Sequence, residues 1–288
     1  MPSIDARFVL GARDKFAVYQ RAILDTAEAF LNNNKTAYIE SLNEFVSAFF
    51  DTRIGVEFAV AAEIMRMLKG QQLEPSHFAA TIKSDSPFSL DDAIKDLMER
   101  TPVVLKPTAE RMGLRISKAY SQSHVIAFAK ATQETVINKV REMITQSLAT
   151  GETPDIASLT GWAAGYANTV LRTNVATATT AARLRQLKDP ELAKVIPCFL
   201  FSAVMDSDTR HNHAAANGIV LKTNNPKWNM LKPPLGYNCR CTLSLLTSAQ
   251  LKRMGRLAPD GTIKESHIPL DAKPDEGFRF SGKESWGL

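Results

Sequence analysis

Histidine and cysteine side chains gather in one stretch near the C-terminal end of the chain. Two of the five histidines, His211 and His213, and two of the three cysteines, Cys239 and Cys241, lie between residues 211 and 241. Imidazole and thiolate are the side chains that most often hold a tetrahedral zinc ion. The stretch therefore suggests a structural zinc site with two histidine and two cysteine ligands.

The spacing of these residues narrows the candidate ligand set. The cysteines form a Cys-x-Cys pair, whereas zinc sites usually use Cys-x-x-Cys. On a helix, His211 and His213 would point about 200° apart and could not face one ion. We therefore expect the more feasible metal set to be His213, Cys239 and Cys241, completed by an aspartate or by Cys198. Two alternatives stay open: small buried cysteines beside a hydrogen-bonded core histidine, or a nucleophilic cysteine paired with His213.

Charged residues flank this stretch. Asp206, Asp208 and Arg210 are expected to form a helix cap and an ion pair at a corner between a strand and a helix. The alternative is a carboxylate pair for acid–base or metal chemistry. Arg240 lies between the two cysteines and, on a strand, would point to the opposite face, where it could contact a carboxylate, a phosphate or a partner.

The elements that must position these side chains form a small α+β module. We predict a short helix that is capped by Asp206–Asp208, runs through Ala216 and ends at Asn217-Gly218. Trp228 and Pro233-Pro234 are expected to pack across the strands. The predicted strands cover residues 198–205, 219–221 and 240–246.

Apolar residues in the first two-thirds of the chain recur at steps of three and four, which indicates amphipathic helices. Asn32-Asn33-Asn34 should separate the first two helices, Asp51 and Thr52 should cap a third, and Gly70 should end it. Breaks are expected near Gly113 or 121–123. The predicted helices cover residues 16–30, 39–49, 58–68, 90–100, 108–149 and 156–187.

The predicted fold class is mainly α: a long-helix N-terminal region followed by a small α+β C-terminal module with short strands and an extended tail. The proposed divisions are 1–194 for a helical docking region, 195–250 for the module and 251–288 for the tail. A composition with 44% hydrophobic and 23% charged residues is typical of a globular protein.

Composition and motifs exclude several classes of protein. No apolar run approaches the ~18 residues of a membrane span, the start lacks the layout of a secretory signal, and three cysteines do not make a disulfide framework. A net charge of +5, from 35 basic and 30 acidic residues, permits nucleic-acid contact without arguing for it. The phosphate-binding Gly-rich loop, Gly-x-Ser-x-Gly and His-Glu-x-x-His motifs are missing from the sequence.

The order of these residues resembles the C-terminal module of the phage Mu protein F-like family, the minor head or head morphogenesis proteins of tailed bacteriophages. The tail phrase 274–280 resembles the ending of such proteins, so the resemblance covers residues 195–280. It includes His213 and leaves out His211. The structural motif that it marks consists of Asp206, Asp208, Arg210, His213, Gly218, Trp228, Pro233, Cys239, Arg240 and Cys241.

The resemblance implies a non-enzymatic virion component that acts in head morphogenesis. Its expected place is the capsid interior near the portal, and the host cytoplasm during assembly. Its expected partners are the portal protein, the major capsid or scaffold protein and packaged double-stranded DNA, with no membrane, and its role extends to DNA retention or delivery. The alternative is a metal-dependent nuclease or transferase carried in the head, which would use His213, Asp206, Asp208 and the cysteines.

Overall fold

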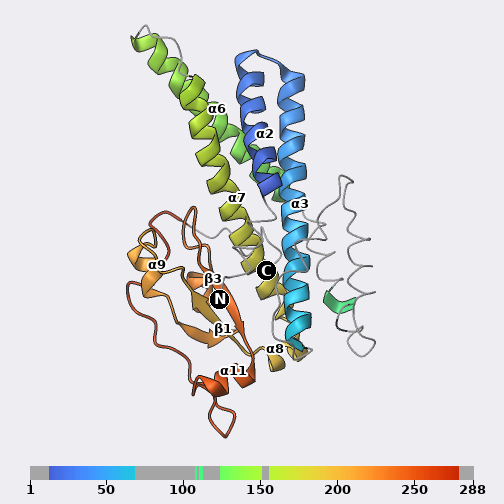
Figure 1. The fold of residues 1–288 in the computed structure, drawn as a ribbon, viewed down its shortest axis with the longest axis vertical. Coiled ribbons are helices and arrows are strands. Elements are labelled where there is room, and N and C mark those ends of the chain that lie inside the picture. The colour runs from blue at the N-terminus through green and yellow to red at the C-terminus, as the bar shows by residue number, and fades with distance from the viewer. Residues whose placement is uncertain (1–12, 69–107, 109, 113–123, 151–155, 279–288) are drawn as a thin grey trace.

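A computed structural model describes residues 13–68, 108, 110–112, 124–150 and 156–278. Long helices run side by side and extend beyond one edge of a small α/β module, which lies against the lower part of α7 (Figure 1). The fold is therefore mostly helical with a small C-terminal sheet, as predicted. The long helices are α2 (Arg13–Leu31), α3 (Lys35–Leu68), α6 (His124–Thr150) and α7 (Ile156–Gln186).

The turn between α2 and α3 confirms the predicted break at the three asparagines. Asn33 adopts the left-handed region, with φ of 50°, which asparagine tolerates better than most residues. The Oδ1 atom of Asn34 then accepts a hydrogen bond of 3.1 Å from the amide of Ala37. That bond satisfies an amide donor in the first turn of α3, which would otherwise lack a partner.

The predicted helix start at Asp51 and Thr52 is wrong, because α3 runs without interruption from Lys35 to Leu68. Aspartate and threonine cost only a few tenths of a kcal/mol more than good helix formers inside a helix. Packing of α3 against α2, α6 and α7 outweighs that cost. Ile39, predicted on the buried face, is exposed.

The second pair of long helices follows the sequence pattern closely. Helix α7 covers Ile156–Gln186, within one residue of the prediction, and α6 covers the C-terminal part of the predicted helix 108–149. The predicted helix 90–100, the helix end at Gly70 and the break near Gly113 or 121–123 lie outside the described residues.

The module contains a three-stranded antiparallel sheet among the described residues, with strand order β2-β1-β3. Its strands are β1 (Cys198–Ser202), β2 (Val220–Lys222) and β3 (Thr242–Leu246). Phe199 pairs with Leu221 on one side and with Leu245 on the other. All three strands were predicted, but β1 ends earlier and β3 begins later than expected.

Helix α9 (His211–Ala215) begins later than predicted. Its N-cap residue is Arg210, so the prediction that Asp206–Asp208 would cap this helix is wrong. The three residues instead form a turn in which Oδ1 of Asp206 accepts from the amide of Asp208 at 3.2 Å. The predicted helix end is confirmed at Gly218, whose φ of 83° favours glycine.

Three further short helices were not predicted. They are α8 (Pro190–Val195), α10 (Trp228–Leu231) and α11 (Ser248–Arg253). Thr247 and Gln250 form a capping box at the start of α11, a Thr-x-x-Gln signal that the sequence displays. The described part of the tail then returns to the module, where the amide of Asp275 donates to the carbonyl of Leu235 at 2.8 Å.

One hydrophobic cluster runs through both the helices and the module. It includes Tyr19 of α2, Ala178 of α7, Phe199 of β1 and Trp228 of α10. This cluster crosses residue 194, and the division of the chain at 194 and at 250 stays a prediction. No helix in the described part of the chain is both long and apolar enough to span a bilayer.

A buried arginine joins two long helices to the sheet. Arg183 of α7 lies 2.9 Å from Oε2 of Glu63 on α3, and both side chains are buried. Its Nη1 donates to Oγ1 of Thr242 at 2.6 Å and to the carbonyl of Leu243 at 2.8 Å, both in β3. A second buried ion pair, between Glu57 and Arg185, joins the same two helices. Buried charges are tolerated when they are paired and hydrogen-bonded in this way.

We expect Arg183→Met to destabilise the protein by about 3–5 kcal/mol, because it leaves Glu63 buried without its partner. Chemical denaturation followed by circular dichroism measures this. The matched control is Lys194→Met, which breaks an exposed ion pair with Glu191 and should change the stability by less than about 0.5 kcal/mol. Equal stabilities of the two variants would contradict the role assigned to Arg183.

Candidate functional site

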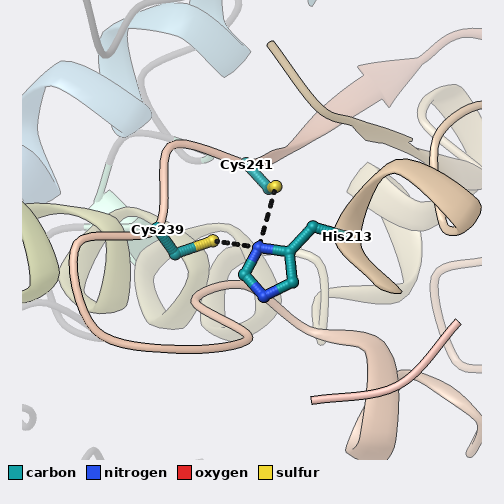
Figure 2. Close-up of side chains that lie close together, drawn as sticks. All are labelled: His213, Cys239 and Cys241. Carbon is teal, nitrogen blue, oxygen red and sulfur yellow. Dashed lines mark hydrogen bonds between the residues drawn. The ribbon is translucent and has the colours of Figure 1, made fainter. Parts of the chain in front are cut away.

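His213, Cys239 and Cys241 meet in one buried cluster. Nδ1 of His213 lies 3.6 Å from Sγ of Cys239 and 3.8 Å from Sγ of Cys241. Figure 2 shows both sulfurs on the same side of the imidazole ring, with Nε2 pointing away from them. The exposed fractions of the three residues are 2%, 1% and 4%. The structure thus brings together the three residues that the sequence singled out as the feasible metal set.

Two contacts hold the cysteine loop in place. The cysteines precede β3, rather than lying on it as predicted, and Asn238 turns the chain with φ of 58°. The amide of Asn238 donates to Oγ1 of Thr173 on α7 at 3.0 Å. Immediately after Cys241, Thr242 is bound by Arg183. The long helix α7 therefore contacts the loop on both sides of the cysteines.

Helix α9 is held against β1 by the turn that follows it. Oδ1 of Asn217 accepts from the amide of Ala203 at 3.0 Å, and the amide of Gly218 donates to the carbonyl of Phe201 at 2.9 Å. These contacts fix the end of the helix that carries His213. The imidazole consequently reaches the cysteines from a helix whose C-terminal end is hydrogen-bonded to the strand β1 and to the residue after it.

Asp275 is a site residue that sequence reasoning missed. Its Oδ1 lies 3.1 Å from Nε2 of His213 and accepts from Nδ2 of Asn212 at 3.0 Å. Its other oxygen lies 3.3 Å from Nε of Arg210. A Cβ atom at Gly236 would stand 1.8 Å from Oδ2 of Asp275, so only glycine leaves room for the carboxylate here. Asp275 lies in the Pro-Asp-Glu-Gly phrase of the tail, which resembles the ending of the family's proteins. The negative charge of its side chain is the feature of the sequence that could have marked it as a partner of His213.

The cluster shifts the pKa values of its own members. Hydrogen bonding with Cys241, and then with His213, lowers the pKa of Cys239 despite its burial. The same contact with Cys239, together with burial, raises the pKa of Cys241. Burial lowers the pKa of His213, but Cys239 and Asp275 outweigh it and the net shift is upward. Without an ion, the arrangement therefore favours a thiolate on Cys239 beside a neutral thiol on Cys241.

A second group of charges lies near the surface. Arg240 makes two hydrogen bonds to the carboxylate of Asp206, each 2.5 Å long. Oδ1 of Asp206 also accepts from Oγ1 of Thr209 at 3.1 Å. The ion pair expected among Asp206, Asp208 and Arg210 is wrong, since Arg210 instead contacts Asp275 and donates to the carbonyl of Tyr237 at 2.9 Å. Sequence reasoning could not foresee this pairing because Asp206 and Arg240 are 34 positions apart.

Two of the proposed metal ligands lie elsewhere. His211 is 88% exposed at its side chain and faces Asp271 at 3.8 Å, which confirms that the two histidines do not face one site. Cys198 packs in a separate apolar cluster with Val220 and Leu251, so the suggestion that it completes the metal set is wrong. Among the described residues, the group that could hold a metal ion contains His213, Cys239 and Cys241, and neither Asp206 nor Asp208 belongs to it.

The remaining motif residues shape the module. Trp228 packs edge-on against Phe199, with ring centroids 5.8 Å apart, and its Nε1 donates to the carbonyl of Lys222 at 2.9 Å. This confirms that Trp228 packs across the strands. Pro233 and Pro234 are buried and are joined by a cis peptide bond.

We expect the pKa of Asp206 to be about 2, chiefly because of its hydrogen bonds with Arg240. In Arg240→Gln the value should return toward its ordinary 3.8. Because the folded pKa is lowered, the ion pair stabilises the protein above the unfolded pKa and is lost as pH falls toward 2. NMR titration measures this, with Asp260 as control, since the amide of Thr262 lowers its pKa independently. An unchanged Asp206 titration in the variant would contradict the assignment.

The sequence comparisons point to proteins of one kind. A family model described as "Phage Mu protein F like protein" matches residues 138–244. The "Putative capsid assembly protein F" of Escherichia phage Mu is 29% identical over 185 residues, which cover 54% of this chain and 42% of the relative. The "Mu-like prophage FluMu F protein" of Haemophilus influenzae is 31% identical over 186 residues, covering 54% of this chain and 44% of the relative. No solved structure matches the chain significantly.

The matched region contains the three residues of the buried cluster, whereas Asp275 lies beyond its end. It begins within α6, includes α7 and ends within β3, so it contains Asp206, His213, Cys239, Arg240 and Cys241. The chain spans less than half the length of the curated relatives that it matches. Residues 138–244 are therefore similar to the phage Mu protein F-like family, and two curated proteins with F-protein names resemble about half of the chain.

Proposed function

We propose that this chain is a structural, non-enzymatic head-assembly protein of a Mu-like tailed bacteriophage. The observation that carries the proposal is the family match over residues 138–244, together with a relative whose printed name is a capsid assembly protein. The proposed location is the host cytoplasm during assembly and the virion afterwards. The burial of the His–Cys–Cys cluster supports a structural role for the module, because a substrate would need access to the site.

We further propose that the protein acts at the portal and inside the procapsid, through the long helices. The tip of the α2–α3 hairpin stands at the end of the bundle remote from the sheet (Figure 1). It exposes two large apolar side chains, Leu31 at 54% and Ile39 at 57%. Apolar side chains exposed on a helical tip are suited to burial against a partner protein. The proposed partner of this tip is the portal protein.

The remaining partners in the proposal are the major capsid or scaffold protein and packaged double-stranded DNA. A net charge of +5 would favour rather than oppose an approach to DNA. Contact of this kind would fit a role in DNA retention or delivery. Because counterions are released when phosphates are neutralised, such binding should weaken steeply as salt is raised.

We expect the double variant Leu31→Glu/Ile39→Glu to bind the phage portal protein at least about tenfold more weakly than the parent, because it places charge where the proposed interface is apolar. Surface plasmon resonance with purified portal protein measures the affinity. The control is Met230→Glu, an equally exposed apolar residue on α10 in the module, which should bind normally. Point variants are preferred to deletion of the bundle, since the bundle and the module share one core. Normal portal binding by the double variant would contradict the assignment of the tip.

The enzymatic alternative is a nuclease or transferase that uses His213, Asp206 and Asp208. We expect the purified protein to leave linear double-stranded DNA intact in the presence of Mg²⁺ or Zn²⁺, because Asp206 is engaged by Arg240 and the cluster is buried. Gel analysis of the DNA measures this. Cleavage that Asp208→Ala abolishes while the variant still enters phage heads would refute the non-enzymatic proposal.

A further inference from the structure

The three side chains of the buried cluster already have the spacing of zinc ligands. With Zn–N bonds of about 2.0 Å and Zn–S bonds of about 2.3 Å, a tetrahedral ion separates nitrogen from each sulfur by about 3.5 Å and the two sulfurs by about 3.8 Å. Nδ1 of His213 lies 3.6 Å and 3.8 Å from the sulfurs of Cys239 and Cys241, and all three ligand atoms lie within 4.8 Å of one another. An ion would therefore need little rearrangement of the protein.

The second observation concerns the far side of the imidazole. A histidine that binds a metal through Nδ1 carries its proton on Nε2, and it commonly donates that proton to a carboxylate that fixes the ring. Nε2 of His213 lies 3.1 Å from Oδ1 of Asp275. Asn212 holds the same oxygen, and Gly236 leaves the space that the carboxylate occupies. Asp275 thus already occupies the position of the carboxylate that orients a metal-bound histidine.

The charge and the chemical type of the ligands indicate which metal ion the site would bind. When a divalent cation displaces the proton of Cys241, both cysteines become thiolates, and the ion neutralises their two negative charges inside a site where each ligand residue is at most 4% exposed. Thiolate and imidazole together favour zinc over magnesium or calcium, which prefer oxygen ligands. Among the described residues, the group offers three ligand atoms to the ion. The carboxylate of Asp275 faces the far nitrogen of His213, and neither Asp206 nor Asp208 joins the group.

We propose that His213 Nδ1, Cys239 and Cys241 bind a zinc ion that staples α9 to the loop before β3, with Asp275 orienting the histidine. The ligands come from positions 26 and 28 residues apart in the chain. Through His213, the ion also links the module to the tail that carries Asp275. The site has a structural role, and it does not depend on which partner the helical bundle contacts.

Metal analysis of the full chain, purified with reduced thiols and without added chelator, tests the proposal. We expect about one zinc ion per chain by mass spectrometry. After exchange into cobalt, we expect visible ligand-field bands of a tetrahedral site and a thiolate-to-cobalt charge-transfer band in the near ultraviolet. Cys239→Ser and His213→Ala should each lose the bound ion, whereas the control Cys198→Ala should keep it, because Cys198 lies in a separate cluster. A parent protein that contains no zinc and takes up no cobalt would overturn the proposal, whatever the variants do.

The positioning role of Asp275 has its own test. Asp275→Asn should weaken zinc binding about 10- to 100-fold in competition with a chromophoric chelator. Gly236→Ala should act in the same direction, because its Cβ displaces the carboxylate without touching a ligand. The matched control is Asp271→Asn, which faces only the exposed His211 and should leave the affinity unchanged. Circular dichroism confirms that each variant keeps its helices, and unchanged affinity in a folded Asp275→Asn variant would refute the orienting role.

Discussion

The buried guanidinium of Arg183 is the constraint on which the arrangement of the protein depends. A charge removed from water must find nearly all of its partners inside the protein, since each missing hydrogen bond costs free energy. Arg183 finds them on Glu63 of α3 and on Thr242 and Leu243 of β3. A shift of helix α7 relative to α3 or to the sheet would therefore expose the guanidinium of Arg183 to solvent or leave it buried without its hydrogen-bond partners. The hydrophobic cluster supplies most of the favourable burial, but it is not directional, and Arg183 fixes the register.

That constraint extends directly to the candidate site. Thr242 follows Cys241 in the chain, so the contact that ties β3 to α7 also limits where the cysteine loop can go. Thr173, on the same helix, holds the amide of Asn238 just before Cys239. His213 approaches from α9, which the Asn217–Gly218 turn fastens to β1. The site is thus assembled by three separate supports, and its geometry is a property of the whole domain rather than of the motif.

The module and the helical bundle differ in what they bury and what they expose. The module buries its reactive side chains, and its hydrogen bonds hold α9, the strands and the tail together. The bundle extends away from it and exposes apolar side chains at the α2–α3 tip. The proposed role in head assembly rests on this division, because the exposed tip would contact a partner while the module maintains the fold.

Local pattern in the sequence was enough to determine the helical character, the asparagine turn after α2, the three strands and the exclusion of a site that both His211 and His213 face. Those features depend on periodicity and on backbone hydrogen bonds between near neighbours, which a single sequence displays. Only the tertiary structure decided that α3 is continuous through Asp51 and Thr52, because packing outweighed weak local preferences. It also paired Asp206 with Arg240 and brought Asp275 to His213 from 62 positions away. Such contacts follow from the path of the folded chain, and no short-range pattern encodes them.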